Sequence, residues 1–307
     1  MISPRVAGLD RGPGGDRECG VAMTIREETA WSADLGGGTR IALVQAGTFR
    51  SDAGTLFGPV PRFMWQQLVV DEIDAQGALL QALNCLLVET PAGRVLIETG
   101  IGERSDEKTR QRRVIEGPPI LAALRAARFD PATVDVVALS HLHFDHAGGL
   151  LAADGSAAFP RARIAAQKLE WEFALGDNPR LQASYDQGEL RLVEQAGWAG
   201  AVDGEAELLP GVTAIRTGGH SGGHQALVVR GHERTVAFFG DLFMRPWSAN
   251  PRWVTAFDDF PLTSVEVKVR LFRRAVEEGW TVVLSHEART PVGRLVAERD
   301  RYRFEPL

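Results

Sequence analysis

The sequence predicts an α/β protein in which β-sheets pack on each other and helices lie outside them. Short apolar runs bounded by turn residues recur in both halves of the 307-residue chain, and segments with helical spacing lie between them. Hydrophobic residues make up 44% of the chain and charged residues 24%, which are ordinary values for a globular domain. We therefore expect one domain over residues 23–307.

The first strands are expected at residues 41–45, 82–89, 94–98 and 134–139, and the turn between the second and third reads as a hairpin. Residues 51–66 hold two prolines and two glycines and are expected to form a loop that packs against the rest. Further strands are expected at 162–166, 212–216, 226–229, 235–239 and 281–284. Helices are expected over 120–127 and 262–278, where apolar residues follow helical spacing.

The bulk properties narrow the range of partners and settings. Residues 1–22 offer few apolar side chains to bury, so we expect a disordered tail there. The net charge is −6 and no long run of Lys or Arg is present, which argues against nucleic acid as a partner. No apolar stretch approaches the roughly 18 residues of a membrane span. The two cysteines cannot form a disulfide framework, so a reducing, cytoplasmic setting is expected.

Four candidate metal ligands lie within six residues directly after the strand at 134–139. They are His141, His143, Asp145 and His146. Alternate residues of an extended segment point the same way, so the first three can converge. Imidazole and carboxylate ligands suit zinc or a similar divalent ion. Because open α/β sites lie at strand ends, we interpret this run as a metal site rather than a His-rich surface loop.

Three further candidates follow apolar strands or lie in a glycine-rich turn. His220 lies in Thr-Gly-Gly-His-Ser-Gly-Gly-His over 217–224, Asp241 follows the strand at 235–239, and His286 follows the strand at 281–284. Each of them alone would more often have a structural role. Together they are expected at the same edge of the sheets as the first four.

This order of ligands resembles the metallo-β-lactamase superfamily over about residues 39–290. The resemblance implies an αββα sandwich with two divalent ions between its halves. By the family's pattern, one ion is bound by His141, His143 and His220, the other by Asp145, His146 and His286, and Asp241 bridges them. Zn²⁺ is the expected metal, with Mn²⁺, Co²⁺ and Fe²⁺ as alternatives.

Several segments without ligands resemble the quorum-quenching N-acyl-homoserine lactonases of this superfamily. Residues 54–61, 96–102 and 250–264 carry this likeness. Asp241 is also found in the phosphotriesterase and glyoxalase II branches, but the C-terminal segment is too short for the glutathione-binding region of glyoxalase II. The lactonases carry a Tyr three residues after the bridging Asp, where this chain has Met244. That departure leaves phosphotriesters and other esters open as substrates.

The resemblance implies a hydrolase in which a metal-bridging hydroxide attacks a lactone or related ester. Binding to a metal lowers the pKa of water from 15.7 toward about 7, which provides a nucleophile at neutral pH. Asp145 is expected to be catalytic as well as a ligand, by accepting a proton as the tetrahedral intermediate collapses. The alternatives are a phosphotriesterase-like or general esterase, and a metal-binding protein without catalysis.

An apolar substrate wall is expected from the early loop at residues 51–66 and from the residues that follow Asp241. Its candidates, which could equally belong to the core, are Phe57, Met64, Trp65, Met244, Trp247, Trp253 and Phe257. His224 is expected either to support Asp241 or a ligand from behind, or to pack within its turn. The expected partner is a small lactone or ester. The early loop also suits a homodimer contact, because a partner tends to cover an exposed apolar loop.

Overall fold

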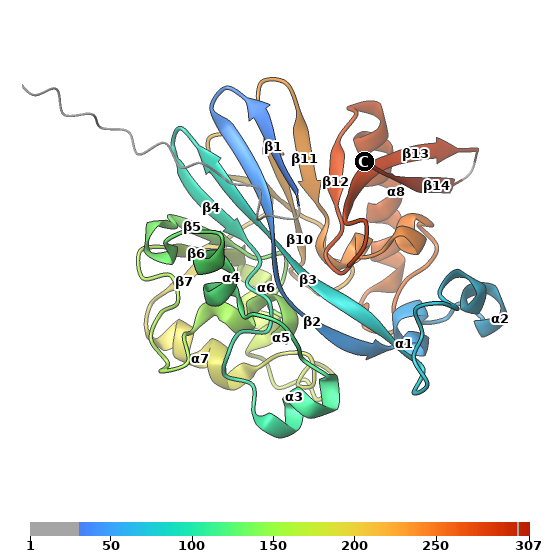
Figure 1. Ribbon diagram of the computed structural model, residues 1–307, viewed down its shortest axis with the longest axis horizontal. Coiled ribbons are helices and arrows are strands. Elements are labelled where there is room, and N and C mark those ends of the chain that lie inside the picture. The colour runs from blue at the N-terminus through green and yellow to red at the C-terminus, as the bar shows by residue number, and fades with distance from the viewer. Residues whose placement is uncertain (1–30, 300) are drawn as a thin grey trace, which may run out of the picture.

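Two seven-stranded sheets form the centre of the molecule in the computed structural model, which describes residues 31–299 and 301–307 (Figure 1). The predicted tail at 1–22 lies outside the described residues. The first sheet has the order β1-β2-β3-β4-β5-β6-β7. Its strands are β1 Trp31–Gly36, β2 Thr39–Asp52, β3 Ala78–Thr90, β4 Gly93–Ile97, β5 Val136–Ala138, β6 Arg163–Gln167 and β7 Ala199–Val202.

The second sheet has the order β14-β13-β12-β11-β10-β9-β8. Its strands are β8 Ala206–Leu209, β9 Val212–Arg216, β10 Gln225–Arg230, β11 Thr235–Phe238, β12 Thr281–Val283, β13 Val292–Glu298 and β14 Arg301–Pro306. Strands β4 to β7 run parallel to one another, and so do β11 and β12. Parallel strands place their carboxyl ends at one edge, and this edge carries the candidate site.

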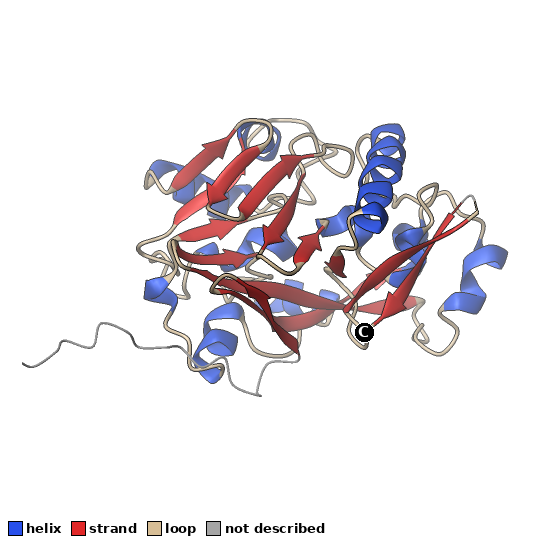
Figure 2. Cartoon of the chain, turned by 90° about the horizontal axis from the view of Figure 1, so that it is seen from above, coloured by secondary structure: helices blue, strands red, loops and turns tan. Residues whose placement is uncertain are grey.

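Helices cover the outer faces of both sheets, which Figure 2 shows from above. The α-helices are α1 Ala53–Phe57, α2 Arg62–Trp65, α3 Glu107–Arg113, α4 Ile120–Ala126, α5 Phe144–Ala147, α6 Lys168–Ala174, α7 Gln187–Gln195 and α8 Pro261–Glu277. The 3₁₀ turns are η1 Gln66–Leu68, η2 Pro131–Thr133, η3 Gly148–Leu150, η4 Gly240–Phe243 and η5 Pro246–Ala249. The predicted αββα sandwich is confirmed.

Alternation along the strands explains why each sheet is buried on both faces. In β3, Leu86 and Val88 pack between the two sheets, whereas Cys85 and Leu87 face the helices of the first layer. Successive residues of a strand point to opposite faces, so an almost wholly apolar strand fits only between two apolar layers. On the far side, Phe272 of α8 packs on the outer face of the second sheet. The core is thus three stacked apolar layers.

Several parts of the chain differ from the sequence prediction, which did not include β1, β7 and β8. Residues 51–66 do not form a loop throughout, because α1 and α2 lie within them. The α1 helix begins where the Asp52 carboxylate accepts a hydrogen bond from the backbone N–H of Thr55 at 2.9 Å, a capping signal that the loop interpretation missed. The hairpin β13–β14 was also not predicted. Only one of its faces is buried, and its exposed face is rich in Arg and Glu.

Candidate metal centre

The seven predicted ligands lie together at the carboxyl ends of the strands. His141 and His143 follow β5, and Asp145 and His146 lie in α5. The other three come from loops after separate strands: His220 after β9, Asp241 in η4 after β11, and His286 after β12. The first sheet therefore supplies four candidates from one continuous segment, and the second sheet supplies three from three loops.

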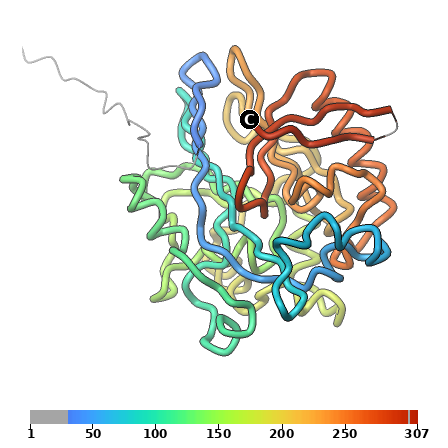
Figure 3. The backbone as a smooth tube through the Cα atoms, turned by 45° about the vertical axis from the view of Figure 1, so that its right-hand side comes forward, coloured from blue at the N-terminus to red at the C-terminus, as the bar shows by residue number. Residues whose placement is uncertain are grey.

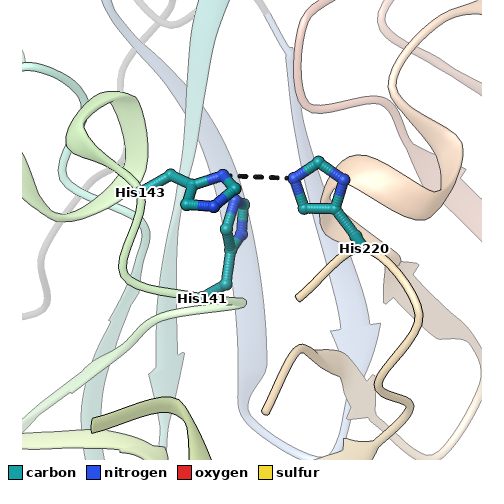
Figure 4. A group of neighbouring side chains, drawn as sticks. All are labelled: His141, His143 and His220. Carbon is teal, nitrogen blue, oxygen red and sulfur yellow. Dashed lines mark hydrogen bonds between the residues drawn. The ribbon is translucent and has the colours of Figure 1, made fainter. Parts of the chain in front are cut away.

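Three histidines meet on one side of the centre. His141, His143 and His220 present ring nitrogens that all lie within 4.8 Å of one another. Figure 4 shows the rings of His143 and His220 facing each other across a gap, with His141 beside them. The distance from His143 Nδ1 to His220 Nε2 is 3.2 Å.

The second group of atoms lies beside the first. Asp145, His146 and His286 present atoms within the same 4.8 Å limit, and so do His141, His146 and Asp241. One carboxylate oxygen of Asp241 lies 3.0 Å from His286 Nε2 and 3.3 Å from His146 Nε2, and the other lies 3.5 Å from His220 Nε2. Asp241 thus stands between the two groups, where the family pattern places the bridging carboxylate.

Three of the histidines are oriented from behind by an acceptor. His220 Nδ1 donates to Asp258 Oδ1 at 2.8 Å, His146 Nδ1 donates to Glu98 Oε2 at 3.2 Å, and His286 Nδ1 donates to the carbonyl of Ala82 at 2.8 Å. An ionised carboxylate or a carbonyl can only accept, so the proton lies on Nδ1. The Nε2 lone pair of each ring is then directed into the centre.

The donor set fits divalent metal ions. Nε2 of His141 and Nε2 of His146 are buried and lack a hydrogen-bond partner among the described residues. Buried polar atoms without a partner are costly, and two imidazole nitrogens facing each other at hydrogen-bond distance need a proton or a cation between them. Histidine nitrogens together with carboxylate oxygens are the ligands that zinc and similar ions take. Which ligand binds which ion stays a prediction.

Burial and neighbouring charges divide the histidines into two kinds. Burial, followed by the nearby imidazoles, holds the pKa of His141 and of His143 well below the ordinary value. Burial also acts to lower the pKa of His146, but the carboxylates of Asp241, Asp145 and Glu98 outweigh it and raise that pKa well above the ordinary value. The metal-free centre therefore favours positive charge next to its carboxylates and excludes it elsewhere.

Glu170 of α6 ties two of the ligand loops together. Its buried carboxylate accepts hydrogen bonds from the backbone N–H of Leu142 at 3.0 Å, the Ser221 hydroxyl at 2.6 Å, the Gly223 N–H at 3.0 Å and the Tyr185 hydroxyl at 3.0 Å. Leu142 separates two predicted ligands, and Ser221 follows His220. A single carboxylate thus fixes both loops, and the sequence analysis did not identify it.

Gly240 and the glycines after His146 are needed because the backbone passes very close to the site. A Cβ at Gly240, which has φ +52°, would lie 2.6 Å from His224 Nε2 and 2.7 Å from Ser140 Cβ. A Cβ at Gly148 would lie 2.2 Å from the carbonyl of Ile101. Residues 96–102, which resemble the lactonases, therefore contact the Gly-Gly pair that follows the His cluster, and side chains at these glycines would prevent that contact.

A cavity of about 630 Å³ opens over the centre. Among the predicted ligands, it is lined by His143, Asp145, His220, Asp241 and His286. The rest of its wall is mixed and includes Phe49, Leu56, Phe144, Met244 and Phe257 together with Arg50, Arg112 and Arg113. Both apolar and charged side chains are thus available to a substrate.

Of the seven residues expected to form the substrate wall, Met244 and Phe257 line the described cavity. Phe57 and three tryptophans form a separate packed cluster, in which Phe57 lies parallel to Trp65 at 4.7 Å and contacts Trp247 and Trp253 at ring distances of 4.3 and 5.9 Å. Figure 3 shows residues 51–66 lying against the chain that follows Asp241. These four aromatic residues fix that contact and do not line the described cavity.

Met64 does not line the described cavity either. It is 48% exposed on the outer side of α2, near the exposed side chains of Phe63, Leu68 and Val70. This apolar surface suits the predicted homodimer contact, which stays a prediction.

His224 lies beside His141, and which of its two expected roles it has stays a prediction. Its ring is buried, its Nδ1 lies 2.7 Å from the Thr217 hydroxyl, and its ring centre lies 5.2 Å from that of His141. Burial lowers its pKa to about 3, so the ring is neutral. The structure shows no hydrogen bond from His224 to a predicted ligand among the described residues, and its contact with His141 is one of packing.

The comparisons with known proteins agree with this geometry. The model of the family described as the metallo-β-lactamase superfamily matches residues 81–286. The chain belongs to the metallo-β-lactamase superfamily. It is 29% identical over 185 residues to the N-acyl homoserine lactonase AiiA of Bacillus thuringiensis subsp. kurstaki, an alignment that covers 56% of this chain and 68% of the relative. A probable metallo-hydrolase of Mycobacterium tuberculosis is 29% identical over 198 residues, covering 57% of this chain and 62% of that relative.

Solved structures superpose on most of the chain. A probable metal-dependent hydrolase from Staphylococcus aureus superposes with a TM-score of 0.79 at 25% identity, over 85% of this chain and 94% of the other. The dizinc quorum-quenching lactonase AidC superposes with a TM-score of 0.76 at 20% identity, over 90% and 97% of the two chains, which shows the fold alone. Membership in the superfamily and relatives of these kinds make the chain a metal-dependent hydrolase.

None of the described helices is both long and apolar enough to cross a membrane.

Proposed function

We propose that this metallo-β-lactamase-superfamily hydrolase cleaves a lactone or related ester, with N-acyl-homoserine lactones as the leading substrates. The observation that carries the proposal is the convergence of all seven predicted ligands beneath one cavity of about 630 Å³ with apolar and charged walls. The likeness to the lactonase AiiA supports the choice of substrate.

The chain's own residues would bind two ions, with His141, His143 and His220 on one side, Asp145, His146 and His286 on the other, and Asp241 between them. When bound, such ions supply hydroxide at neutral pH and polarise a carbonyl group. Asp145 lines the cavity beside the ligands and is 8% exposed. Its carboxylate is therefore placed to accept a proton from the reacting group and to deliver it to the leaving oxygen.

The structure offers no tyrosine hydroxyl to assist the leaving group. Met244 lines the cavity at the position where the lactonases carry Tyr. The ring of Tyr185 lies 4.8 Å from that of His143, but its hydroxyl donates to Glu170. This arrangement favours a second candidate, a phosphotriesterase-like or general esterase activity with the same ligands, because a good leaving group needs no such assistance.

A substrate panel separates the candidates. The protein loaded with zinc, manganese or cobalt is assayed with acyl-homoserine lactones of several chain lengths, a phosphotriester, a β-lactam and lactoylglutathione. We expect turnover of the lactones. Turnover of the phosphotriester alone would reject the lactonase proposal, and two bound metals without any turnover would favour a non-catalytic protein.

A further inference from the structure

Arg113 is the last residue of α3 and points a guanidinium group into the active-site cavity. The guanidinium carbon lies 3.5 Å from the centre of the Phe144 ring, and both residues line the cavity together with Asp145. Stacking on an aromatic face leaves the N–H groups at the edge of the guanidinium plane free to bind a ligand. Arg113 is therefore placed to contact a ligand in the cavity.

The segment that carries Arg113 is fixed to the sheet. Directly after α3, the backbone of Glu116 pairs with Thr48 of β2 through N–H···O distances of 2.8 and 3.0 Å. Gly47, with φ +89°, allows this approach, because a Cβ there would lie 2.6 Å from the Glu116 carbonyl. Arg113 thus stands on a braced segment at a set place above the metal ligands.

The guanidinium of Arg113 is half-buried and has no hydrogen-bond or ion-pair partner among the described residues. The other cavity arginine that is as sheltered, Arg50, lies 3.1 Å from the carboxylate of Asp74. Burial lowers the pKa of Arg113, although the nearby Asp145 carboxylate acts to raise it. A partly desolvated cation without a partner is unfavourable, and an acceptor supplied by a ligand would relieve that cost.

Metal binding would make the need for an acceptor greater. Asp145 and Asp241 are the carboxylates of the cavity nearest the centre, and bound divalent ions would neutralise both. Arg113 would then face a cavity whose remaining charge near the centre is positive. Such a cavity selects a substrate that carries an oxygen-rich group as well as the bond to be cleaved.

We propose that Arg113 determines specificity by binding an acceptor oxygen of the substrate outside the scissile group, a carboxylate more tightly than a neutral carbonyl. The inference rests on the proposed lactone or ester hydrolysis and adds the substrate feature that the enzyme selects. A carboxylate oxygen and a neutral carbonyl oxygen both accept hydrogen bonds from a guanidinium group. Substrates that carry one or the other distinguish the two in the experiment below.

The first experiment compares three lactones in the zinc-loaded enzyme and in Arg113→Met, which keeps an unbranched apolar side chain and removes the guanidinium donors. The substrates are N-succinyl homoserine lactone, N-hexanoyl homoserine lactone and a γ-lactone with a plain alkyl chain. We expect kcat/KM to fall about 100-fold, about 10-fold and less than about 3-fold, respectively. Arg113→Lys should restore most of the loss for the carboxylate substrate only, because Lys keeps the charge without the planar fork.

The matched control is Arg110→Met on the same helix, which removes the same charge outside the cavity lining. All three lactones should then be cleaved within about 2-fold of the wild-type rate. An equal loss on all three lactones in Arg113→Met would assign Arg113 a structural role, and wild-type rates on all three in that variant would also overturn the proposal.

A binding measurement keeps this inference separate from the proposed function. Calorimetry of the zinc-loaded protein measures the affinity for glutarate, which has two carboxylates, and for pentanoate, which has one. We expect glutarate to bind at least about 10-fold more tightly in the wild type, and the two ligands to bind equally in Arg113→Met. Equal affinities in the wild type would overturn the role of Arg113. Absence of lactone and ester turnover with the glutarate preference intact would instead reject the proposed function.

Discussion

The ligand histidines and the side chains of the cavity wall above them differ in what holds them. His220, His146 and His286 each donate a hydrogen bond to an acceptor behind the centre, and two of these acceptors are carboxylates. Phe257 of the wall is 40% exposed, and Arg113 has no polar partner among the described residues. The geometry of the reaction is therefore set by the scaffold, whereas the choice of substrate depends on side chains that can change without disturbing it.

The strongest test of this contrast compares two phenylalanines. Phe57 is fully buried in the cluster that it forms with three tryptophans. Phe57→Ala should therefore lower the free energy of unfolding by about 3–5 kcal/mol. Phe257→Ala should change that free energy by less than about 1 kcal/mol and should instead alter KM for long acyl chains. Chemical denaturation and steady-state kinetics measure the two effects. A change in KM with unchanged stability in Phe57→Ala, and a loss of stability in Phe257→Ala, would instead support Phe57 as a residue of the substrate wall.

The support behind the ligands is tested at Glu170. Glu170→Gln removes a buried charge that four donors share, and it places an amide N–H₂ among them, so we expect a loss of about 2–3 kcal/mol in unfolding free energy. Glu172→Gln on the exposed side of the same helix is the matched control and should cost less than about 0.5 kcal/mol. Equal stability of the two variants would show that Glu170 does not tie the ligand loops together.

A smaller effect is expected at Asp258, which orients a single ligand. Asp258→Asn weakens the hydrogen bond that fixes the His220 ring, so zinc affinity should fall roughly 10- to 100-fold, or about 1.4–2.7 kcal/mol. Asp259→Asn alters the adjacent carboxylate, which pairs with Arg180 at 3.1 Å, and should leave zinc affinity unchanged. Competition with a chromophoric chelator measures both variants. Equal zinc affinities in the two variants would remove Asp258 from the support of the centre.

How much the sequence could predict follows the same division. The ligands were readable because residue type and strand position both restrict them, as with His286 at the end of β12. Glu98 and Asp258 act through contacts between segments 48 and 38 positions apart, which no local pattern indicates, although both lie in segments that resemble the lactonases. The wall was predicted from apolar character alone. That property does not distinguish Phe57 in the core from Phe257 at the cavity, and it excludes Arg113.

The central claim is a two-metal centre bridged by Asp241, and the most direct test measures metal content and lactone hydrolysis in parallel in the wild type and in Asp241→Asn. Elemental analysis of the purified, zinc-loaded wild type should give two ions per chain. The variant should hold fewer, and its kcat/KM should fall by more than about 100-fold. Two bound metals and wild-type turnover in Asp241→Asn would contradict the account.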